Sequence, residues 1–82
     1  MNRKHRVTLE KIKSRPERSD IPWNDIEALF LAMGAEISEG SGSRVRVFLN
    51  GTRAVFHRPH PQKETEKGAI KSVRRFLEAA EE

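Results

Sequence analysis

With 82 residues, of which 35% are hydrophobic and 34% charged, the chain fits one small soluble domain with a single modest core. It contains no cysteine, which excludes disulfides and thiolate metal sites and suits the reducing cytoplasm, where we expect the protein to act. Its longest apolar run, residues 28–33, is too short to span a membrane, so we expect no membrane contact.

The net charge of +4 is distributed in blocks. Residues 1–18 carry seven Lys or Arg and residues 40–75 carry nine, whereas residues 19–39 carry five acids and no base. Two basic blocks favour a polyanionic partner such as nucleic acid, because lysine and arginine neutralise phosphates and release counterions. The alternative is that the basic segments serve only solubility.

The N-terminal segment is polar and basic. Residues 1–6 are expected to be mobile, and residues 8–14 can form a short helix with Leu9 and Ile12 on one side. Pro16 ends this helix, because the residue before a proline is disfavoured in the helical region. So short a helix is marginal in isolation and would need packing against the domain or a partner.

The next helix is predicted to begin at Pro22, which suits a first helical turn, and to end at Gly34, a favourable residue after a helix. We interpret Trp23 as a core anchor in preference to a base-stacking platform. A short strand follows over residues 35–39, with Ile37 pointing inward, and leads to a flexible loop. The apolar stripe of the helix consists of Trp23, Ile26, Leu29, Phe30 and Met33.

Residues 44–57, RVRVFLNGTRAVFH, are predicted to form a β-hairpin. Asn50-Gly51 is a strong signal for a two-residue type I′ turn, because both residues tolerate positive φ. A two-residue loop places Arg44 opposite His57, and the alternation of side chains makes one face apolar. The basic face is the candidate site, although its arginines can also be read as simply solvated. It carries Arg44, Arg46, Arg53 and His57.

Two prolines, Pro59 and Pro61, end the hairpin, and a final helix is predicted over residues 67–80. The elements follow in the order α-β-β-β-α after the optional short helix. We therefore expect an α+β fold of two layers, in which two helices cover one face of an antiparallel three-stranded sheet. The buried stripe of the final helix is Ile70, Val73, Phe76, Leu77 and Ala80. Its outer side is expected to carry Lys71, Arg74 and Arg75.

Three motifs accompany this order of elements: G-S at 42–43, P-H-P at 59–61 and K-G-A-I-K-S-V at 67–73. Together they resemble the HicA family of toxins from prokaryotic type II toxin–antitoxin systems. The resemblance implies a fold similar to the double-stranded-RNA-binding domain, ribonuclease activity on messenger RNA, and inhibition by a HicB-type antitoxin. We accordingly divide the chain into a basic N-terminal extension, residues 1–20, and a HicA-like domain, residues 21–82.

The resemblance also implies a catalytic histidine directly after G-S, where this chain has Arg44. An arginine stays protonated and cannot serve as a general base. Metal-free RNA cleavage needs a base, an acid and a cation that stabilises the charged phosphorane. We expect His57 to be the acid/base and Arg44 the phosphate clamp, with His60 as a second proton carrier if its loop folds back.

The expected partners are messenger RNA and a HicB-type antitoxin, with no cofactor and no metal. Alternatively, His57 is an ordinary strand-end residue and His60 shapes a turn, which would leave a non-catalytic binding module of the same fold. The basic face could also be the docking surface for an acidic antitoxin. A metal site at the two histidines is disfavoured, because no further ligand has suitable spacing. The expected RNA-binding residues are Ser43, Arg44, Arg46, Arg53, Arg58, Lys63 and Lys71.

Overall fold

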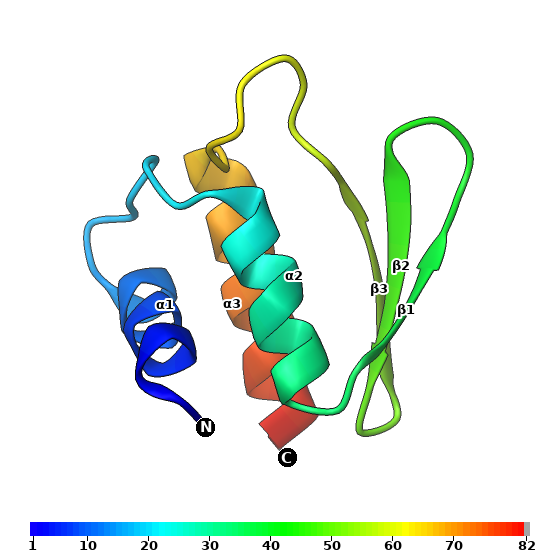
Figure 1. Cartoon of the computed structure of the whole chain (residues 1–82), viewed down its shortest axis with the longest axis horizontal. Helices are drawn as coiled ribbons and strands as arrows, with labels where there is room; N and C mark the ends of the chain where they lie inside the picture. Colours follow the sequence, from blue (N-terminus) through cyan, green and yellow to red (C-terminus); the bar gives the residue numbers. More distant parts are fainter. Residues whose placement is uncertain (82) are drawn as a thin grey trace.

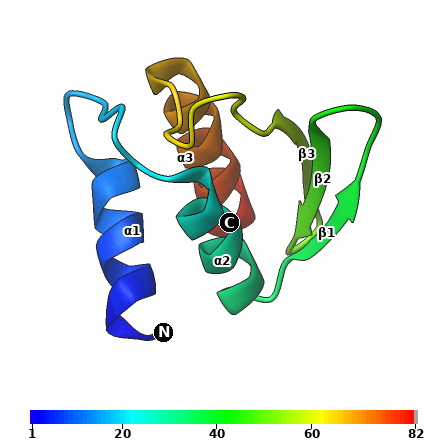
Figure 2. The ribbon, with the colours of Figure 1, turned by 45° about the horizontal axis from the view of Figure 1, so that its top comes forward.

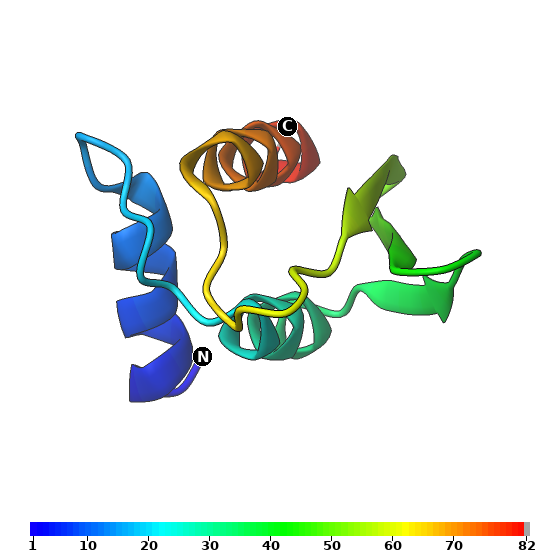
Figure 3. The same cartoon turned by 90° about the horizontal axis from the view of Figure 1, so that it is seen from above.

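A computed structural model describes residues 1–81 and confirms the α+β class. The α2 and α3 helices lie on one face of the sheet, and α1 lies on the far side of these two helices (Figure 1). The same three layers are seen from above in Figure 3, where α1 is the layer that the two-layer prediction did not contain. No helix within residues 1–81 is long and apolar enough to cross a membrane. The elements are α1 (Arg3–Lys13), α2 (Trp23–Ala32), β1 (Glu36–Glu39), β2 (Arg44–Leu49), β3 (Thr52–His57) and α3 (Lys67–Glu81).

The hairpin of β2 and β3 has the predicted turn and register. Asn50 and Gly51 have φ angles of 49° and 81°, as a type I′ turn requires at its two central residues. Arg44 consequently pairs with His57 at the far end of the hairpin. The side-chain amide of Asn50 also donates a hydrogen bond of 3.1 Å to the carbonyl oxygen of Ala80, which attaches the turn to the end of α3.

The α2 helix ends where the glycine predicts. Gly34 has a φ of 94°, and its N–H donates to the carbonyl oxygen of Leu31, while the N–H of Ala35 donates to that of Phe30. This pair of bonds is a Schellman motif, which satisfies the last carbonyls of a helix and reverses the chain. The chain therefore enters β1 at once, and β1 pairs with β2 in antiparallel fashion.

Four aromatic rings fill the core between the helices and the sheet. Trp23 and Phe30 come from α2, Phe56 from β3 and Phe76 from α3, and neighbouring ring centroids lie 5.5–6.5 Å apart. These separations fall in the range of favourable aromatic pairs. Trp23 is only 3% exposed, which confirms its interpretation as a core anchor.

The N-terminal helix is longer than predicted and is packed against the other helices. It begins at Arg3, so residues 3–6, which were expected to be mobile, belong to a helix. The reason is a local cap: the side chain of Asn2 accepts a hydrogen bond of 2.9 Å from the N–H of His5. Ile12 of this helix is fully buried in the common core. The division of the chain at residue 20 stays a prediction.

The expectation that Arg74 lies on the outer side of the last helix was also wrong. Arg74 is 7% exposed, and its guanidinium donates to the carbonyl oxygens of Ile12 at 2.9 and 3.0 Å and of Ser14 at 3.0 Å. It also forms an ion pair of 2.9 Å with Glu17. The end of α1 leaves carbonyl groups without partners inside the helix, and Arg74 supplies the missing donors. This contact docks α1 on α3.

Candidate nucleic-acid interface

The sheet has one covered face and one open face. All three helices lie on the same side of it, as Figures 2 and 3 show. Buried and exposed residues alternate along β2, so every second side chain points away from the helices. An open groove of about 760 Å³ crosses the outer face. The outward residues of the hairpin are Arg44, Arg46, Phe48, Arg53, Val55 and His57, and β1 adds Glu36 and Ser38.

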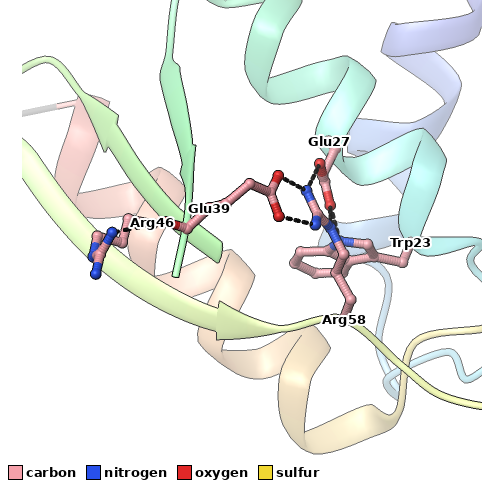
Figure 4. Close-up of polar contacts among 5 residues, drawn as sticks. All are labelled: Trp23, Glu27, Glu39, Arg46 and Arg58. Atoms are coloured by element: carbon pink, nitrogen blue, oxygen red, sulfur yellow. Dashed lines mark hydrogen bonds and ion pairs between the residues drawn. The ribbon is translucent and has the colours of Figure 1, made fainter. Parts of the chain in front are cut away.

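Three arginines on this face carry free positive charge. No salt bridge within residues 1–81 involves Arg44, Arg46 or Arg53. Arg46 donates one hydrogen bond of 2.8 Å to the backbone carbonyl of Glu39 (Figure 4). The guanidinium carbon of Arg53 lies 5.2 Å from the ring centroid of Phe48, a cation–π contact. The open face therefore presents cations that remain available to an anionic ligand.

Arg44 and His57 lie directly opposite each other at one end of the hairpin, and both are exposed. A hydrogen-bonded turn precedes Arg44, although the sequence predicted a flexible loop there: the N–H of Gly40 donates to the carbonyl of Arg44 at 2.9 Å. A Cβ atom on Gly40 would lie 2.9 Å from the Cβ of Arg44, so this close approach requires a glycine. The carbonyl of Ser43 accepts a bond of 2.9 Å from the N–H of Arg58, which holds the two chain segments together beyond the strands.

His57 and His60 line one hollow of about 370 Å³ between the free edge of β3 and the first turns of α3. The role of His60 as a second proton carrier stays a prediction. Thr65 and Ser72 also line this hollow, and the hydroxyl of Thr65 is buried without a hydrogen-bond partner among residues 1–81. Within the same residues, no group of three or more His, Asp or Glu side chains could hold a metal ion.

Arg58 is engaged with two carboxylates (Figure 4). Its Nε lies 2.7 Å from Glu27 of α2, and its Nη2 lies 2.9 Å from Glu39 of β1. The indole N–H of Trp23 donates to the same Glu27 carboxylate. These charge-assisted bonds lower the pKa of Glu39 and raise that of Arg58 from their ordinary values. Arg58, the residue after His57, therefore connects the end of β3 to both α2 and β1 through its two ion pairs.

The two predicted lysines lie away from the open sheet face. Lys63 is exposed in the loop before α3, and its carbonyl accepts a hydrogen bond of 2.9 Å from the N–H of Trp23. The Lys71 ammonium lies 3.8 Å from Glu17, in the segment that follows α1. The structure thus brings Ser43, Arg44, Arg46, Arg53 and His57 to the hairpin surface but does not bring Lys63 or Lys71 there.

Sequence reasoning gave no role to the two exposed apolar residues of the open face. Phe48 is 36% exposed and Val55 is 56% exposed, and both line the outer groove. The signal for them was the alternation itself, which puts Phe48 and Val55 on the face that carries the arginines.

The structure defines the class of this protein: a small α+β domain whose sheet has one face covered by helices and one open face that carries arginines. The family model described as the HicA toxin of bacterial toxin–antitoxin systems matches residues 23–81, which is more than half of the chain. The chain therefore belongs to the HicA toxin family, whose members pair with an antitoxin. No curated protein and no solved structure gives a match.

Proposed function

We propose that this HicA-family protein binds messenger RNA on the open sheet face and cleaves it without a metal ion at the Arg44 end of the hairpin. The observation that carries the proposal is the direct opposition of Arg44 and His57 at the end of a face whose three arginines form no salt bridge within residues 1–81. Such a pair supplies a proton carrier and a phosphate-binding cation at one point.

The chemistry follows from the residue types. Neutral His57 takes the proton of a ribose 2′-hydroxyl, and the resulting oxyanion attacks the adjacent phosphorus. The bond from phosphorus to the 5′-oxygen breaks, and protonated His60 gives its proton to the leaving oxygen. The products are a 2′,3′-cyclic phosphate and a 5′-hydroxyl. Arg44 donates to the non-bridging oxygens, where negative charge grows in the transition state.

The proposed protein partner is a HicB-type antitoxin that covers the same face. Its contact surface is expected to be acidic, because Arg44, Arg46 and Arg53 would otherwise be buried without counter-charges. Occupation of this face by the antitoxin would exclude RNA and so neutralise the toxin.

The test is RNA cleavage in EDTA by the purified protein, free of any co-purified partner. Four proteins are compared on one long messenger RNA: wild type, His57→Ala, Arg44→Ala and the control Arg75→Ala, which changes an exposed arginine of α3. We expect His57→Ala to abolish cleavage, Arg44→Ala to slow it by about 100-fold or more, and Arg75→Ala to cleave as wild type does.

Two results would contradict the proposal. Undiminished cleavage by His57→Ala would remove this histidine from the chemistry. If the wild type binds RNA but does not cleave it, the alternative function holds: the protein is a non-catalytic RNA- or partner-binding module of the same fold.

A further inference from the structure

The apolar residues of the open face are not needed to fill the core. Phe48 and Val55 point away from the helices, while the residues next to them along each strand face the core. Val55 pairs with Arg46 and Phe48 pairs with Arg53, which makes Phe48 and Val55 diagonal neighbours about 7–8 Å apart. Single exposed apolar residues are common on protein surfaces, but two that meet in one groove among arginines suggest a ligand.

The Phe48 ring is already in a cation–π contact with Arg53. The Arg53 guanidinium lies over it at 5.2 Å, so ring and guanidinium together form a π-rich surface on the outer face. Nucleobases stack on aromatic rings and on guanidinium planes whatever their sequence, because every base has a π face. The neighbouring Arg44 and Arg46 lie along the same strand, where they can neutralise a phosphate backbone.

We propose that Phe48 and Arg53 hold a nucleobase of single-stranded RNA that lies along β2, with Val55 against the sugar or base edge. This inference rests on the proposed function and names its substrate class. A duplex is the less suitable ligand, because its bases are stacked on each other and proteins read it through its shape and backbone. An acidic peptide would satisfy the arginines but would make no specific use of the Phe48 ring.

The distance of Phe48 from Arg44 indicates which part of the RNA it would contact. It lies four residues from Arg44 along β2, which corresponds to about 13 Å. The stacked base therefore belongs to a nucleotide that flanks the cleaved bond. We expect Phe48 to govern affinity and the choice of cleavage site among single-stranded segments, whereas the Arg44 and His57 end of the hairpin governs the chemical step.

The test measures affinity by fluorescence anisotropy on 2′-O-methyl RNA, which has no free 2′-hydroxyl and cannot be cut by the proposed route. The probes are an unstructured single strand and a duplex of the same length. The variants are Phe48→Ala, Phe48→Trp and the control Leu31→Ala, which truncates an exposed apolar residue of α2. Equal melting temperatures of the variants confirm that each is folded.

The proposal predicts that Phe48→Ala weakens single-strand binding by about tenfold or more, while Phe48→Trp and Leu31→Ala bind as wild type does. Duplex binding should be weaker than single-strand binding in the wild type, and Phe48→Ala should not change it.

If the wild type binds single-stranded RNA and Phe48→Ala binds it equally well, the stacking site is overturned, although RNA binding itself is still supported. If the wild type binds neither probe, the proposed function itself fails. If Phe48→Ala no longer binds the antitoxin but still binds single-stranded RNA as the wild type does, the groove belongs to a protein partner and the inference is overturned.

Discussion

Replacing Arg74 with methionine should destabilise the fold strongly, although the sequence suggests an exposed position. Methionine keeps most of the aliphatic stem but removes the guanidinium, which donates to two carbonyl groups at the end of α1 and pairs with Glu17 at 2.9 Å. The Glu17 side chain is only 15% exposed. Its carboxylate would keep two longer contacts, at 3.7 Å to Arg15 and 3.8 Å to Lys71.

The expected cost follows from these contacts. Removing one partner of a buried ion pair costs about 3–5 kcal/mol, and the remaining contacts of Glu17 favour the lower end of that range. We expect a loss of about 3 kcal/mol in the free energy of unfolding. For a domain of this size, that corresponds to a fall in Tm of about 12–20 °C.

The assay is urea and thermal unfolding followed by circular dichroism. Arg75→Met is the matched control, because the neighbouring arginine is exposed, and it should change stability by no more than about 0.5 kcal/mol. Adding Glu17→Gln to Arg74→Met should recover part of the loss, since the uncompensated carboxylate is gone. If Arg74→Met is no less stable than Arg75→Met, the docking of α1 through Arg74 is refuted.

Two further predictions concern pH and salt. Pairing with Arg58 lowers the pKa of Glu39 from its ordinary 4.5, so the carboxylate stabilises the fold above pH 4.5 and this contribution is lost as pH falls through the lowered pKa. Glu39→Gln should therefore flatten the acid limb of a plot of Tm against pH, and an unchanged limb would show that the pair contributes nothing. If α1 contacts RNA, replacing Arg3 and Lys11 with glutamine should reduce the slope of log affinity against log salt by about one to two, whereas an unchanged slope would exclude α1 from the interface.

Local chemistry explains why the hairpin could be predicted in full. Asn50 and Gly51 determine the turn type, and the turn determines the register, so the opposition of Arg44 and His57 follows without any long-range information. The helical stripes were predictable for the same reason, because apolar spacing depends on residues within a few turns.

The errors arose where a side chain meets groups distant in the sequence. Arg74 is buried because carbonyls near residue 12 need donors, and nothing in the pattern around Arg74 indicates this contact. The two ion pairs of Arg58 could not be predicted for the same reason, because Glu27 lies in α2 and Glu39 in β1, and its assignment to RNA stays a prediction. The conformation of the loop after β3 could not be predicted from the sequence either. That His60 lines the same hollow as His57 was therefore not predicted.

The most direct test of the central claim is the chemical identity of the RNA ends produced in EDTA by the purified protein. Cleavage by the 2′-hydroxyl route with His57 as base predicts fragments that end in a 2′,3′-cyclic phosphate and begin with a 5′-hydroxyl, and no fragments from His57→Ala. Fragments that begin with a 5′-phosphate, or the same fragments from His57→Ala, would contradict it.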